Sequence, residues 1–175
     1  MKSFDFTLKF NLPDPAADAA VFLDRLAAAG CDDATVGIGL NGRIALEFTR
    51  ESRSAADAVL GALRDVSRAI PGAVLVEAAP DFVGLTDVAR ILGFSRQYAR
   101  KVMISSGSEF PAPVHDGNPT LWRLAKVLAW AEARGAEVDR ALLEVARAAH
   151  QVNLAREMRD AVPSVQRRAQ ALVGG

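Results

Sequence analysis

Hydrophobic and polar residues alternate from residue 4 to residue 10, in the run Phe-Asp-Phe-Thr-Leu-Lys-Phe. Successive side chains of a β-strand point to opposite faces, so this alternation predicts a strand with one buried face. After Pro13-Asp14-Pro15 the apolar positions change to a spacing of three and four residues. That spacing predicts an Ala-rich helix from Asp14 or Pro15 to Gly30.

The rest of the first eighty residues continues this succession of elements. Strands predicted at 35–40 and 43–50 flank Asn41-Gly42, the strongest short hairpin signal. A second amphipathic helix is predicted over 54–70 and a last strand over 73–78. The order strand, helix, strand, strand, helix, strand is that of a split βαβ or ferredoxin-like domain. Its sheet carries helices on one face, and the other face is free to pair, bind or be covered.

Residues 85–103 read as two short helices joined by a tight turn at Gly93-Phe94-Ser95. We expect Thr86 to cap the first helix, Gly93 to end it and Ser95 to cap the second. The exposed side chains of the second helix, 95–104, would be Arg96, Gln97, Arg100 and Lys101, with Tyr98 as a secondary candidate for DNA contact. Arg and Gln can each make paired hydrogen bonds to base edges, so this segment is typical of a helix-turn-helix with its recognition helix in the major groove.

A hairpin signal follows this helix pair. Asp116-Gly117-Asn118 favours a turn between Val114 and Leu121-Trp122. A short hairpin directly after a recognition helix is a wing, here 110–122, which lies on the phosphate backbone or in a minor groove. The candidate DNA contacts therefore also include His115, Asn118 and Arg123, together with the capping residues Thr86 and Ser95.

These residues resemble the winged DNA-binding domain of the MerR and phage-excisionase-like superfamily over residues 81–135. The shared elements are Leu85, Thr86, Ala89, Leu92, Gly93 and Ser95, then Phe110-Pro111-Ala112-Pro113, then Leu121-Trp122-Arg123 and Trp130. The resemblance implies double-stranded DNA as the partner. The whole chain also resembles an actinobacterial-type group of winged-helix proteins that share the segment 29–37, which implies architecture more than activity. We expect Trp122 and Trp130 to be core residues rather than platforms for bases.

The charge distribution agrees with this placement. The chain has 21 basic and 21 acidic residues. Counted by segment, residues 1–80 have 8 basic and 11 acidic side chains, 81–135 have 7 and 5, and 136–175 have 6 and 5, giving net charges of −3, +2 and +1. The small excess in 81–135 is too little for strong non-specific binding, which depends on neutralising many phosphates.

Composition narrows the class of protein further. Half of the residues are hydrophobic, which indicates a globular chain. The start does not read as a signal peptide, and no run of about 18 apolar residues predicts a membrane span. The single cysteine, Cys31, fits a reducing compartment, so we expect a cytoplasmic protein associated with the nucleoid.

No catalytic or metal-binding constellation emerges from the sequence. His115 and His150 have no partner at metal-ligand spacing, and Asp32-Asp33 supply too few oxygens for Ca²⁺ or Mg²⁺. The loop 11–15 is acidic, unlike the anion cradle of an acylphosphatase-type enzyme. We therefore expect no enzymatic activity, no metal and no cofactor.

The C-terminal part, 136–175, reads as helical up to Pro163. Its apolar positions recur at alternating four- and three-residue steps, as in the seam of a coiled coil or of a helix packed on its own domain. These positions are Val138, Leu142, Val145, Ala149 and Val152. Helix-turn-helix proteins usually read symmetric operators as dimers, so we expect a homodimer through this seam or through the open sheet face.

The sequence thus predicts an α+β protein with a ferredoxin-like domain at 1–80, a winged helix-turn-helix at 81–135 and a dimerisation segment at 136–175. The expected function is that of a sequence-specific transcriptional regulator. Its first domain would sense a small-molecule ligand or mediate assembly. The alternative is an antitoxin or accessory protein whose first domain binds a protein partner while the wing autoregulates a promoter. A phage-excisionase-like architectural role is a variant of either.

Overall fold

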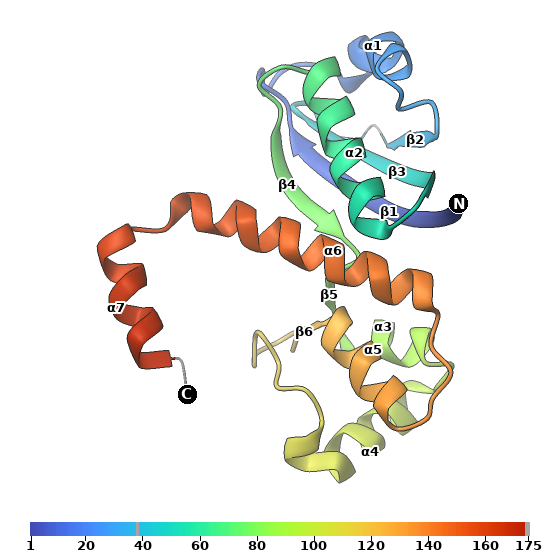
Figure 1. Ribbon diagram of the computed structural model, residues 1–175, viewed down its shortest axis with the longest axis vertical. Coiled ribbons are helices and arrows are strands. Elements are labelled where there is room, and N and C mark those ends of the chain that lie inside the picture. Colours follow the sequence, from blue (N-terminus) through green and yellow to red (C-terminus); the bar gives the residue numbers. More distant parts are fainter. Residues whose placement is uncertain (38, 174–175) are drawn as a thin grey trace.

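The computed structural model describes residues 1–37 and 39–173 and shows a mixed α+β chain (Figure 1). The strands are β1 (Lys2–Asn11), β2 (Ala34–Gly37), β3 (Arg43–Ser52), β4 (Val74–Ala79), β5 (Phe82–Val83) and β6 (Trp122–Arg123). The α-helices are α1 (Leu23–Ala28), α2 (Ala55–Ala69), α3 (Leu85–Ile91), α4 (Arg96–Ser106), α5 (Leu124–Ala133), α6 (Arg140–Glu157) and α7 (Pro163–Val173). Short 3₁₀ turns lie at Ala19–Phe22, Gly107–Glu109 and Met158–Asp160.

The first half is built on a four-stranded antiparallel sheet in the order β2-β3-β1-β4. The predicted alternation in β1 is confirmed, because Phe4 and Leu8 are fully buried under α2 while Asp5 and Lys9 are exposed. The outer face is polar: Lys9 pairs with Glu77 at 2.7 Å, and Thr49 Oγ1 donates to Asp5 at 2.7 Å. Ile38, part of the strand predicted at 35–40, lies outside the described residues.

The long first helix predicted up to Gly30 is wrong. Asp14 and Asp18 each accept a hydrogen bond from the backbone N–H two residues later, at 2.8 and 2.9 Å. Such local bonds offer the backbone an alternative to helix, and the chain turns here instead. What remains is a 3₁₀ turn and the six-residue α1, with Leu23 39% exposed.

The predicted helix pair in the second half is confirmed as α3 and α4. Gly93 has a φ of +69°, and the N–H of Phe94 donates to the carbonyl of Ala89 at 2.8 Å, which closes α3 in a Schellman motif. The capping role expected of Thr86 is wrong, because Gly84 is the N-cap and Thr86 lies inside α3. The carboxylate of Asp87 accepts from the N–H of Gly84 at 3.4 Å.

The predicted hairpin is also present. His115 and Leu121 form a β-bridge, in which the N–H of Leu121 donates to the carbonyl of His115 at 3.0 Å. The chain continues directly into β6, which pairs antiparallel with β5. Trp122 is 4% exposed and Trp130 is partly buried in the same cluster, so their expected place in the core is confirmed.

α6 contributes to the hydrophobic clusters of both halves, and Figure 1 shows it lying between the sheet and α5. Val145 and Ala149 are buried in the first cluster, while Leu143 and Ala146 are buried in the second. The members of the predicted seam pack within their own chain, which agrees with the second of the two alternatives, a helix packed on its own domain. Val138 and Leu142 pack against the second cluster, and Val152 packs against the first.

Beyond α6, the 3₁₀ turn at Met158–Asp160 leads to α7, which begins at Pro163. None of the residues of α7, all of them described, is buried. Over the described part of the chain, no helix has both the length and the apolar character needed to cross a membrane.

Candidate nucleic-acid interface

The second helix of the pair presents a basic face to solvent. Ser95 caps α4, as predicted, because its Oγ accepts a hydrogen bond from the N–H of Tyr98 at 3.1 Å. On the inner side, Ala99 is buried against the rest of the domain. On the outer side, the exposed residues include Arg96, Gln97, Arg100 and Lys101. The sequence of α4 contains no acidic residue, so this face carries only positive charge.

A hollow of about 500 Å³ separates α4 from the hairpin. Four of the predicted contact residues line it: Thr86 from α3, Arg96 and Arg100 from α4, and Asn118 from the hairpin. Two guanidinium groups thus share one concave surface with an amide and a hydroxyl. That combination can donate hydrogen bonds to phosphate oxygens or to the acceptor atoms of base edges.

The remaining predicted contacts lie outside this hollow. Gln97, Lys101 and His115 are exposed. Tyr98 is 51% exposed and meets the ring of Phe94 edge-on, with the ring centroids 4.9 Å apart. Tyr98 is therefore partly engaged in holding the turn before α4, and about half of it remains exposed.

Arg123 does not fit the DNA-contact role predicted for it. Its side chain is 9% exposed and forms a salt bridge with Asp81, whose side chain is fully buried. The guanidinium also lies over the ring of Phe82, 4.1 Å from the centroid. Both contacts hold β6 against the chain that enters the second half, so Arg123 is a structural residue.

Asp81 and its partners are the polar cluster that the sequence did not indicate. Asn153 on α6 donates to Asp81 at 2.8 Å, and His150 Nδ1 lies 3.9 Å from the other carboxylate oxygen. Asn153 and His150 both lie about seventy positions from Asp81 in the sequence, so no local spacing could have revealed this cluster. The one available signal was a carboxylate set between apolar strand residues.

Two acidic side chains lie near the basic face. Asp87 lines the hollow, but it is paired with Arg90 at 3.1 Å. Asp116 stands in the hairpin turn and is exposed. In the described structure, neither carboxylate forms a salt bridge with Arg96 or Arg100. Both guanidinium groups are therefore available to a polyanion that enters the hollow.

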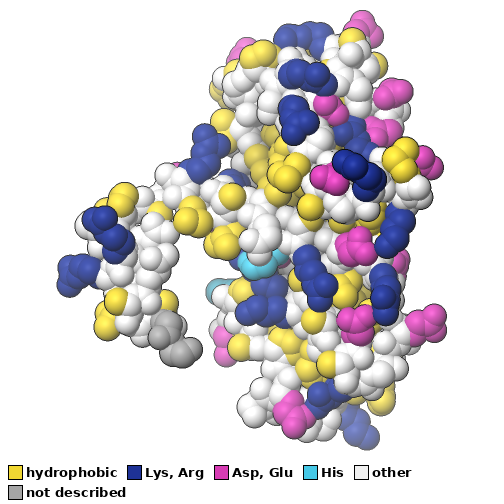
Figure 2. All heavy atoms as spheres, in the orientation of Figure 1, with side chains coloured by type: hydrophobic (Ala, Val, Ile, Leu, Met, Phe, Trp, Pro, Cys, Tyr) yellow, Lys and Arg dark blue, Asp and Glu magenta, His cyan; other side chains and the backbone are white. Residues whose placement is uncertain are grey.

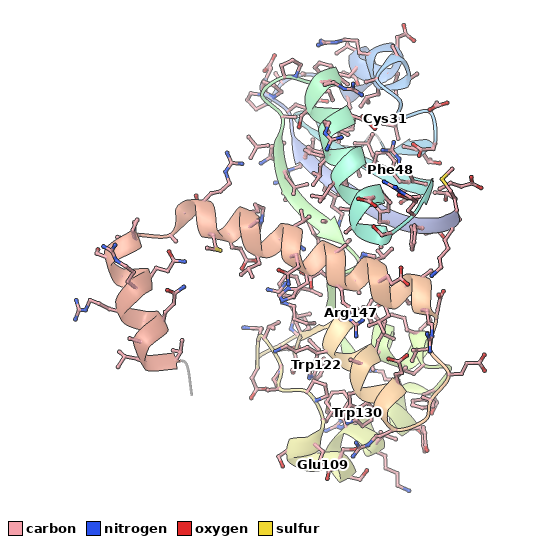
Figure 3. The ribbon with its side chains drawn as sticks, in the orientation of Figure 1. Cys31, Phe48, Glu109, Trp122, Trp130 and Arg147 are labelled. Carbon is pink, nitrogen blue, oxygen red and sulfur yellow. The ribbon has the colours of Figure 1, made fainter. Side chains whose placement is uncertain are left out.

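Aromatic packing fixes the hairpin relative to α5. The ring of Phe110 meets Trp130 at 4.9 Å and Trp122 at 6.0 Å, both edge-on. Figure 3 labels both tryptophans in the lower half of the molecule, beside α5. The approach to the hairpin is thus anchored while its tip, with His115 and Asn118, is exposed.

Within the described residues, no three potential ligands among His, Cys, Asp and Glu gather closely enough to hold a metal ion. Comparison with protein-family models, with curated proteins and with solved structures finds no match to this chain.

Proposed function

We propose that this chain is a sequence-specific DNA-binding transcriptional regulator whose second half acts as a winged helix-turn-helix of the MerR and excisionase-like kind. The observation that carries the proposal is the shared hollow, which joins Arg96 and Arg100 of α4 to Asn118 of the hairpin. A helix with an exposed basic face enters the major groove, and an adjacent hairpin contacts the backbone or a minor groove.

The first half supports this proposal as a ferredoxin-like domain. The succession of its elements and the antiparallel order β2-β3-β1-β4 agree with that fold. The fold itself does not determine an activity. We assign to this half a role in assembly, because it carries a net negative charge and would be repelled by the phosphate backbone.

The test begins with selection of bound duplexes from a random DNA pool, followed by affinity measurements on selected and random sequences. Arg96→Ala should weaken binding to the selected site by about 1–3 kcal/mol and relax the base preference at one position. The matched control is Arg64→Ala, which removes another exposed arginine side chain, from α2 in the other half. It should leave the affinity unchanged.

Two results would contradict the proposal. One is a pool in which no sequence is enriched. The other is an Arg96→Ala protein, folded as judged by its urea unfolding curve, that binds the selected duplex as tightly as Arg64→Ala does. Equal losses on selected and random DNA would instead reduce Arg96 to a phosphate contact.

A further inference from the structure

α7 carries an apolar stripe that its own chain does not cover. Val162, Val165, Ala169 and Leu172 follow one another at steps of three, four and three residues, so they lie along one side. Val165 is 61% exposed and Leu172 is 85% exposed. A separate helix of eleven residues is marginal in water, because most helical stability in proteins comes from packing an apolar face. α7 therefore needs a partner surface.

The same chain offers an apolar groove between α2 and α6. It has a volume of about 460 Å³, and its floor is made largely of small apolar side chains. These are Ala55, Ala56 and Val59 from α2 with Ala148, Val152 and Ala155 from α6. Alanines let a third helix approach closely, and Leu60, 52% exposed, forms one wall. Figure 2 shows hydrophobic side chains where α2 and α6 meet, and others on α7.

We propose that the groove between α2 and α6 is the seat for α7 of a second copy of this chain. An amphipathic helix laid into a groove with anchors at such spacing is a common mode of recognition. The charged side chains in the groove lining, Glu144 and Arg147, balance each other, so the apolar stripe of α7 supplies the match to the groove. Each copy has one helix and one groove, so the exchange closes into a two-fold dimer with both seats filled.

The connection before α7 favours a second copy over the same chain. Arg156 Nη1 donates to the carbonyl of Val76 at 2.8 Å, which fixes the last turn of α6 on β4. The 3₁₀ turn at Met158–Asp160 then directs the chain outward, and α7 leaves the body in Figure 1. To reach its own groove, α7 would have to undo this turn and reverse its direction along α6. The inference does not depend on DNA binding, and its test uses no DNA.

Sedimentation of the intact chain at tens of micromolar is the first measurement, and a dimer is expected. Leu172→Glu on α7 and Leu60→Glu in the groove should each give a monomer. Both residues are exposed, so neither change should alter the free energy of unfolding of the body. Gln170→Glu adds the same charge to α7 away from its apolar stripe and should remain a dimer.

Cysteine cross-linking identifies the occupant. In a Cys31→Ser background, protein with Leu60→Cys is mixed with protein with Val165→Cys and oxidised, and a cross-linked pair of chains is expected. Glu47→Cys, on the outer face of the sheet, replaces Leu60→Cys in the control and should not cross-link. Three results would overturn the proposal. One is an intact chain that is a monomer, and another is a dimer that survives both Glu substitutions. The third is a chain carrying both Leu60→Cys and Val165→Cys that cross-links only within itself.

Discussion

Arg50 shows how one side chain fixes a loop. Its guanidinium donates to both carboxylate oxygens of Asp33, at 2.6 and 2.9 Å, and to Asp65 at 2.8 Å. It also donates to the carbonyl of Gly30 at 2.7 Å. The side chain is 12% exposed and belongs to β3. Its hydrogen bonds therefore connect the turn between α1 and β2 to the sheet and to α2.

We expect Arg50→Lys to lower the free energy of unfolding by about 3 kcal/mol. The guanidinium donates hydrogen bonds to two carboxylates at once, and a single ammonium group would leave one or both of them poorly paired. Urea unfolding measures the change. Arg53→Lys, at an exposed position on the same segment, is the control and should be neutral. An Arg50→Lys protein as stable as this control would contradict the assigned role.

Cys31 lies beside this network and should respond to alkaline pH. Burial, aided by the charge of Asp65, raises the pKa of the Cys31 thiol to about 11 from an ordinary value of 9.0. Between these two values the unfolded chain loses the proton and the folded chain keeps it, so folding becomes less favourable as the pH rises. The free energy of unfolding of the native chain should fall relative to Cys31→Ala between pH 9 and 11. Parallel pH profiles for the two proteins would refute this.

At the scale of elements, Asn153 connects α6 to the last strand of the sheet. Its side-chain amide accepts from the N–H of Ala78 and donates to the carbonyl of Ala78, both at 2.8 Å. The same amide reaches Asp81 at 2.8 Å, where the chain passes into the second half. One side chain on α6 therefore satisfies the backbone and the buried carboxylate at the junction.

Asn153→Ala should destabilise the chain by roughly 2–4 kcal/mol, because it leaves two buried backbone groups of Ala78 without partners. Gln151→Ala, on an exposed position of the same helix, removes a side chain of similar chemistry and serves as the control. Equal unfolding curves for the two variants would show that water replaces the lost bonds.

Elements whose signals are local could be predicted from the sequence. The alternation in 4–10, the Ser95 cap and the Gly93 turn all depend on neighbours within a few positions, and the structure confirms each of them. The helix predicted up to Gly30 failed because Asp14 and Asp18 form turns of their own. Apolar periodicity on α6 indicated a covered face but not which chain covers it.

The candidate site was predictable for a similar reason, and only in part. Arg96 and Arg100 follow a cap and share a helix face, so their exposure could be read from spacing. From the sequence, Arg123 was as good a candidate for DNA contact as Arg96. Its burial, however, depends on its pairing with Asp81, forty-two positions away. A buried pair of that kind is set by the tertiary arrangement and leaves no pattern along the chain.

At the scale of the whole molecule, α6 belongs to both hydrophobic clusters, so we expect the two halves to unfold as one cooperative unit. Both tryptophans belong to the second hydrophobic cluster, so their fluorescence reports the second half. Val66→Ala, at a fully buried site on α2 in the first half, should cost about 2 kcal/mol. Because α6 belongs to both clusters, the urea midpoint seen by tryptophan fluorescence should fall as well.

A tryptophan transition unchanged by Val66→Ala would contradict this coupling. So would a far-UV circular dichroism curve with an earlier, separate step. The control is Val21→Ala in the 3₁₀ turn at Ala19–Phe22, where the side chain is 66% exposed and contributes to neither cluster, so the midpoint should not move.

The position of α6 along the chain also has a consequence for synthesis. The ribosome releases the sheet first, then α3, α4 and α5, and only afterwards the helix that covers both clusters. Domains commonly fold one after another as they emerge, beginning with the N-terminal one. Here the nascent chain keeps two incomplete apolar surfaces until residue 149 has emerged, so we expect both halves to complete their folding together, once α6 is available.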